Sequence, residues 1–227
     1  MKSPPNAARG TKRERTRDDL LVSTQILLQE NNAAALRIRQ ITDHAGLVHA
    51  SFYNYYPDVS ALITDLGELL GATHAITMAQ LVSADDSPAK RFALITRATL
   101  RIIAQQPFLG RLMFDVGLPI LRSGGYLRRS LRFDIEQGIT LGDFDVNDIE
   151  IVVSLVSGAI HGVALDLHRG AFPSAKIDSA TERLLIGLGV ETAAAAQLAF
   201  APLPVLPPTE LPMRWLALPS NIFVFDK

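Results

Sequence analysis

The chain has 227 residues, of which 48% are hydrophobic and 7% aromatic, so it is long enough for one or two domains with a buried core. It contains no cysteine, which excludes disulfide frameworks, thiolate zinc sites, iron–sulfur clusters and a cysteine nucleophile. The 22 basic and 23 acidic residues give a formal net charge of −1, which argues against a protein that is basic throughout.

The positive charge is concentrated at the start of the chain. Residues 1–17 hold six basic residues and a single acidic one, Glu14, so the remaining 210 residues are acidic overall. Dividing the chain after Leu62 gives eight basic and six acidic residues before that point. We interpret residues 1–13 as a basic, flexible arm in front of an acidic body.

Three short helical segments are predicted between residues 14 and 62. The first has an apolar stripe at helical spacing from Leu20 to Leu28. The second covers about 38–45 and is ended by Gly46. The third covers about 48–55 and is stopped by Pro57, because a proline disfavours helical geometry in the residue before it. Two short helices joined by a tight glycine turn are the layout of a helix-turn-helix unit.

Further helices are predicted along the rest of the chain. Asp58 is a good N-cap for the first of them, and Ser87 followed by Pro88 is a typical helix start. No stretch alternates like a strand with hairpin turns, which predicts an all-α fold of about nine to ten helices. The expected ranges of these helices are 58–82, 88–105, 107–117, 121–141, 145–169, 173–188 and 191–200.

Neither end of the chain indicates export or a membrane. The longest apolar helical run, Ile151 to Leu165, is shorter than the roughly 18–20 residues of a membrane span, and His161 interrupts it. Six of the 13 prolines lie in residues 201–227, which we expect to form an extended strap or a partly disordered tail. We predict a cytoplasmic protein without membrane contact.

The segment around the glycine turn, ITDHAGLVHASFYNYYPDVSAL, resembles the signature of the TetR family of transcriptional regulators. Upstream, TRDDLLVSTQILLQEN is similar to the first helix of that family. The close match covers about residues 14–62, and beyond it the resemblance is architectural. The matching positions are Ile41, Ala45, Gly46, Ser51, Phe52, Tyr53, Tyr56 and Leu62.

Three positions depart from the family pattern. Val59 stands where the family has a lysine that contacts phosphate, and Val48 stands where it has a helix-capping serine. Such a cap is commonly worth about 1 kcal/mol. Arg37 replaces the usual threonine near the start of the second helix. One phosphate contact is therefore lost and another gained.

The resemblance implies a three-helix head, residues 14–62, that binds double-stranded DNA. Tyr53 and Tyr55 would hydrogen-bond phosphates, and Arg37 would approach the DNA backbone. The basic arm would add salt-dependent affinity. Groove-facing groups would be His49, Ser51 and Asn54, and the cations of the arm would be Arg13, Arg15 and Arg17.

The resemblance also implies that residues 63–200 bind an effector and form a homodimer. A mainly apolar pocket would suit a small molecule of unknown identity, and no cofactor or metal is expected. The expected pocket residues are Met78, Phe92, Arg101, Phe108, Arg111, Met113, Phe114, Phe133 and His161. The expected dimer interface contains Ile151, Leu155, Gly158, Gly162, Leu165, Leu184 and Leu188.

Two other readings stay open on the sequence alone. A metal-dependent enzyme would use His161, Asp166 and His168, although their spacing does not place all three on one helix face. A helical interaction protein that has lost specific DNA binding would account for Val48 and Val59. Our prediction is a ligand-responsive regulator that binds a palindromic operator as a homodimer. Repression is the family default.

Overall fold

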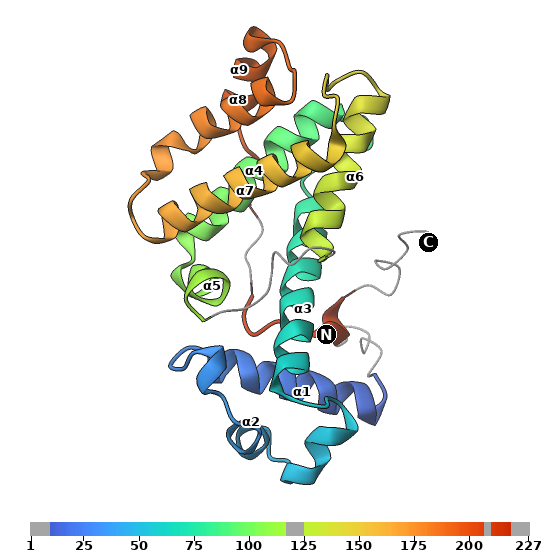
Figure 1. The fold of residues 1–227 in the computed structure, drawn as a ribbon, viewed down its shortest axis with the longest axis vertical. Coiled ribbons are helices and arrows are strands. Elements are labelled where there is room, and N and C mark those ends of the chain that lie inside the picture. Colours follow the sequence, from blue (N-terminus) through green and yellow to red (C-terminus); the bar gives the residue numbers. More distant parts are fainter. Residues whose placement is uncertain (1–9, 117–124, 207–209, 219–227) are drawn as a thin grey trace, which may run out of the picture.

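The computed structural model describes residues 10–116, 125–206 and 210–218. Within these ranges the regular elements are nine α-helices, α1 to α9, joined by short 3₁₀ and π turns, and no strand occurs. The helices form a small lower head and a larger upper body, connected by one long helix (Figure 1). This arrangement confirms the predicted all-α fold with a helical head on a helical body.

The head consists of α1 (Lys12–Leu27), α2 (Ile38–His44) and a 3₁₀ turn, η2 (His49–Asn54). The side chain of Thr11 caps α1 by accepting a hydrogen bond from the backbone of Glu14. Helix α1 therefore begins before residue 14, and Arg13 belongs to it rather than to a flexible arm. The third segment is a 3₁₀ turn rather than the expected α-helix, and Phe52 anchors it in the core of the head.

Helix α3 (Val59–Ala79) links the two parts. Asp58 caps it as predicted, with Oδ1 accepting from the backbone N–H of Ala61 at 2.8 Å. The first half of α3 packs in the core of the head, and its second half enters the body, where Met78 is buried among residues of α4. One continuous helix thus joins the helix-turn-helix to the body.

The body is built on α4 (Pro88–Gln105), which begins after the predicted cap Ser87, together with α6 (Tyr126–Thr140) and α7 (Ile149–His168). In the sequence, α5 (Pro107–Gly110) and a π turn, η3 (Arg111–Asp115), lie between α4 and α6. Helices α8 (Ile177–Gly187) and α9 (Thr192–Phe200) pack together at the far end from the head. Gly189, with φ of +88°, permits the turn between them.

Helix α7 differs from its sequence-based description. It contains 20 residues and, by length and composition alone, is long and apolar enough to cross a membrane. The predicted apolar run, Ile151 to Leu165, was therefore shorter than the helix that forms. In the body it packs against α4 and α6 through buried residues such as Val153 and Val156. Its opposite face is exposed: Leu155 is 67% and Ile151 56% accessible.

The chain after α9 returns to the head. Residues 201–206 run along α4, and residues 210–218, which include the 3₁₀ turn η5 (Trp215–Ala217), lie against α1 (Figure 1). Met213 is buried in the core of the head. This part of the tail is therefore a docked strap; residues 219–227 lie outside the described ranges.

Candidate DNA-binding surface and effector cavity

The turn between α2 and η2 has the backbone that a helix-turn-helix needs. Gly46 adopts φ of +67°, a conformation that a side chain would strain. The next residue, Leu47, donates its N–H to the carbonyl of Thr42 at 2.8 Å and so closes the end of α2. At Val48 no side-chain cap is present, in line with the missing serine. The turn geometry thus rests on the glycine and on the burial of Phe52 and Tyr56.

Most of the predicted DNA contacts lie on the surface of the head. Tyr53 is 55% accessible, and Ser51 and Tyr55 are half-buried. The exposed residues of this set also include Arg13, Arg15, Arg37, His49 and Asn54.

Two of these cations are also tied to the head itself. The Arg13 guanidinium lies 6.0 Å from the centre of the Tyr55 ring and donates to the carbonyl of Asn54 at 3.4 Å. Arg37 donates to the carbonyls of Ala34 and Leu36 at 3.0 and 3.1 Å. Arg13 therefore lies next to η2, and Arg37 lies just before α2.

Arg17 was predicted to be a DNA-binding cation of the basic arm, but the structure places it in an ion pair within the head. Its guanidinium makes two hydrogen bonds to Asp65 of α3, at 3.0 and 2.6 Å, and stacks 5.2 Å from the centre of the Trp215 ring. Tyr56 donates a short hydrogen bond to the same carboxylate. Burial and the Asp65 charge raise the pKa of the Tyr56 phenol well above its usual value. Arg17 thus joins α1 to α3 and is not a free cation.

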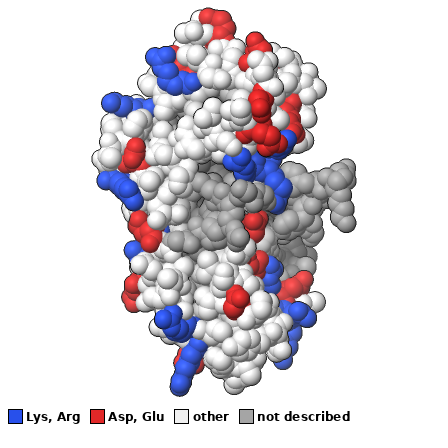
Figure 2. Space-filling model, viewed as in Figure 1, with Lys and Arg blue, Asp and Glu red and all other residues white. Residues whose placement is uncertain are grey.

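The charge on the visible face of the molecule is mixed. Basic and acidic side chains both occur over the lower part, where Figure 1 places the head, and over the body (Figure 2).

A cavity of about 470 Å³ lies in the body among α3, α4, α6 and α7. Its size is in the range of small-molecule pockets. Four of the nine predicted pocket residues line it: Met78, Phe92, Met113 and His161. Its other walls include Ile95, Ile103, Leu127, Leu131, Ile160 and Ala164. The wall is therefore mainly apolar.

The other five predicted pocket residues lie elsewhere. Arg101 pairs with Asp178 at 2.8 Å, and Arg111 donates to the carbonyl of Leu28 at 3.2 Å. Phe133 is exposed and Phe108 packs against the core of the head. Phe114 stacks on His168 and packs edge-on against His161, behind the cavity wall. Helical spacing does not show which partner helix an aromatic or basic residue meets.

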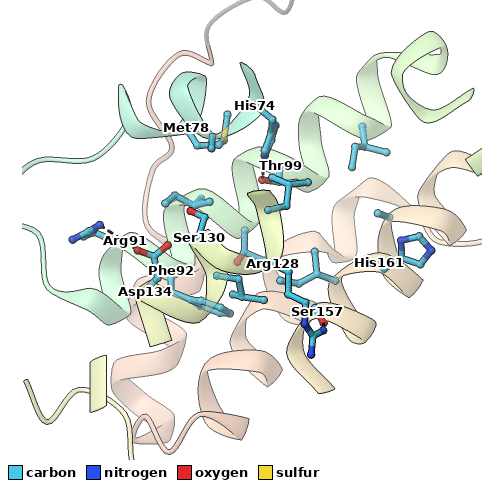
Figure 3. A pocket seen from close by; sticks show the side chains of 18 of the residues that line it. His74, Met78, Arg91, Phe92, Thr99, Arg128, Ser130, Asp134, Ser157 and His161 are labelled. Atoms are coloured by element: carbon cyan, nitrogen blue, oxygen red, sulfur yellow. Dashed lines mark hydrogen bonds and ion pairs between the residues drawn. The ribbon is translucent and has the colours of Figure 1, made fainter. Parts of the chain in front are cut away.

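The cavity also holds polar groups that the sequence reading did not single out. The His74 ring of α3 is hydrogen-bonded to the Thr99 hydroxyl of α4 at 2.8 Å, and burial lowers its pKa to about 4 (Figure 3). Arg91 of α4 pairs with Asp134 of α6 at 3.2 Å. These residues are hydrophilic positions within otherwise apolar helix faces. Such an interruption of an apolar face was the feature of the sequence that could have indicated them.

A second polar group of the wall lies along α7. Arg128 of α6 donates to the hydroxyls of Ser157 and Ser154 at 3.0 and 2.8 Å (Figure 3). The buried Nδ1 of His161 has no hydrogen-bond partner among the described residues, and burial lowers the pKa of this ring. A ligand with an apolar body and a polar group would complete this wall.

The three residues considered for a metal do not meet. His161 lines the cavity, His168 contacts Asp115 at 2.8 Å, and Asp166 is exposed. Among the described residues no group of three or more His, Asp or Glu side chains is placed to hold a metal ion.

Residues 87–200, half of the chain, match the family model described as "Tetracyclin repressor-like, C-terminal domain". The chain belongs to the TetR family. Members of this family are regulators of transcription and not enzymes, which confirms that part of the sequence-based prediction. A comparison with curated proteins finds no match.

Solved structures of TetR regulators share the fold. RolR in complex with resorcinol is 24% identical, with a TM-score of 0.62 over 88% of this chain and 100% of that one. FadR from Bacillus halodurans is 12% identical, with a TM-score of 0.59 over 84% and 100% of the two chains. FadR from Bacillus subtilis in complex with stearoyl-CoA is 16% identical, with a TM-score of 0.58 over 74% and 97%.

The exposed face of α7 corresponds to the predicted dimer interface. Ile151, Leu155 and Gly158 are exposed along it, and Gly162 and Leu165 are half-buried. A Cβ built on Gly158 or Gly162 meets no atom within 4 Å, so the surface there is open. At the end of α8, Leu184 is half-buried, and Leu188, the C-cap residue, is completely buried within the body.

Proposed function

We propose that this TetR-family protein is a ligand-responsive repressor that binds a palindromic operator as a homodimer and is released by a small, mainly apolar effector. One observation supports this most: α3 joins a head with exposed polar and basic side chains to a body with a cavity of about 470 Å³. The ligands named for the similar structures, resorcinol and stearoyl-CoA, agree with a small-molecule site.

The proposal divides the chain by role. The DNA-binding head is residues 14–62 with the first turn of α1 added, the effector and dimer body is 63–200, and the tail is 201–227. In the head, Tyr53 and Tyr55 would contact phosphates, and His49, Ser51 and Asn54 would face the major groove. Arg13, Arg15 and Arg37 would supply salt-dependent affinity.

The proposed homodimer would form through α7. Two half-sites about 34–36 Å apart require a two-fold dimer. The face with Ile151 and Leu155 is apolar and exposed in the single chain, and Gly158 and Gly162 allow a second helix to approach closely. Because operator DNA is in the cytoplasm, we place the protein there.

The test is a selection of bound genomic fragments with the purified full-length chain. We expect a palindrome with two half-sites one helical turn apart, lost in the variant Tyr53→Ala with Asn54→Ala. Tyr53 and Asn54 are both exposed, so this variant should keep its fold. Recovery of no common sequence would refute operator binding. It would favour the alternative, a helical interaction protein without specific DNA binding, which is consistent with Val48 and Val59.

A further inference from the structure

The strap, residues 210–218, occupies a specific docking site on α1. Gln25 is completely buried, and its side chain makes two hydrogen bonds with the backbone of Met213: Nε2 donates to the carbonyl, and Oε1 accepts from the N–H, both at 2.9 Å. Asp18 is also buried, and its carboxylate accepts from the backbone N–H groups of Trp215 and Leu216 at 3.1 and 3.0 Å. Buried polar side chains require such partners.

The same tail is tied to the body at its other end. The carbonyl of Ala201, just after α9, accepts a hydrogen bond from Arg97 of α4 at 2.7 Å. Arg97 is buried and pairs with Asp178 of α8 at 2.9 Å. The tail therefore contacts the body at Ala201 and the head at residues 213–216.

Met213 of the strap lines a small side pocket that adjoins the cavity of the body. A side pocket of about 40 Å³ lies between Met213 and the face of α3 that carries Thr73, His74 and Thr77. This side pocket shares five wall residues with the main cavity, among them His74 and Thr99. The volume is enough for a small alkyl group but not for a ring.

We propose that the side pocket is a subsite for an apolar branch of the effector, and that filling it displaces Met213 and loosens the strap from α1. The inference rests on the proposed function, whose effector site it extends. Physically, a group larger than the side pocket cannot enter while Met213 stays in place, because packed interiors do not absorb extra volume. Displacing Met213 pulls its backbone from Gln25, and α1 loses a contact that orders it.

Helix α3 offers a competing route from the cavity to the head, because it runs through both. The two routes predict different results when Met213 is already released from Gln25. Transmission through the strap ends when the hydrogen bonds of Gln25 are removed, whereas transmission through α3 continues. The experiment is built on this difference.

A cavity-filling substitution serves as the probe, so that no effector needs to be known. Thr77→Phe places a ring in the side pocket, and the matched control Thr77→Ser leaves the pocket empty. Among the described residues, the Thr77 hydroxyl bonds only to the carbonyl of Thr73 in its own helix, so its loss costs little. Thr77→Leu is a smaller filling variant, should the ring prevent folding. Amide hydrogen exchange is measured on the full-length chain in each case.

Gln25→Ala removes the two hydrogen bonds that hold the backbone of Met213. Gln29→Ala, at an exposed position just past the end of α1, is its control. We expect Thr77→Phe to speed exchange of strap and α1 amides about tenfold, as expected for the loss of one to two hydrogen bonds. In the Gln25→Ala background the additional effect on α1 should vanish. It should persist with Gln29→Ala.

An equal effect of Thr77→Phe on α1 with and without Gln25 would overturn the inference and assign the coupling to α3. Unchanged exchange in the strap would overturn it as well. Neither readout uses DNA, so a failure to find an operator would refute the proposed function while leaving this result to be judged separately.

Discussion

Substituting Arg17 tests whether its guanidinium belongs to the fold or to the DNA surface. Its two hydrogen bonds to Asp65, at 3.0 and 2.6 Å, are charge-assisted, and such bonds contribute about 1.5–3 kcal/mol when protected from water. The Arg17 side chain is 39% exposed, which lowers this to about 1–2 kcal/mol. For a chain of this length each kcal/mol lowers Tm by roughly 2–4 °C. Arg17→Gln should therefore lower Tm by about 3–6 °C.

The matched control is Arg15→Gln, because Arg15 is exposed two residues earlier in the same helix. This variant should keep its Tm. For binding to a random-sequence duplex, the slope of log K against log salt concentration should become smaller by roughly one. Thermal unfolding and a salt titration of DNA binding are run on both proteins. A reduced salt slope with unchanged Tm for Arg17→Gln would show that Arg17 binds phosphate, and our assignment would be refuted.

Three further predictions follow from the head, the α7 face and the cavity. Tyr53→Phe should weaken binding to operator and random duplex alike, by about 1 kcal/mol for one lost phosphate hydrogen bond; a loss that depends on one operator base contradicts the phosphate role. Leu155→Glu should sediment as a monomer, whereas Leu141→Glu, equally exposed but at the C-cap of α6, should not; a dimeric Leu155→Glu would move the interface. Burial lowers the pKa of His74 from 6.5 to about 4. As the pH drops from about 6.5 to 4, the imidazole is protonated in the unfolded chain but not in the folded one, so the free energy of unfolding falls over this range. His74→Gln should remove up to about 3 kcal/mol of that fall in urea unfolding at pH 4 and 7, and an identical pH profile would assign it to other groups.

The sequence by itself determined the local features of this protein. Asp58 and Ser87 cap α3 and α4 where their chemistry predicted, and Gly46 adopts the left-handed backbone that the turn after α2 requires. These features depend on a few neighbouring residues, and so they are legible in the chain. The resemblance around the turn also identified the family, which the match over residues 87–200 then showed independently.

The tertiary structure decided which distant residues meet. Arg17 finds Asp65 48 residues away, and Gln25 finds Met213 188 residues away; spacing along α1 contains no information about either partner. For the same reason Leu188, an apolar residue at helical spacing, turned out to be core rather than interface. Periodicity shows that a face is apolar or polar, and only the packing of the helices decides what covers that face.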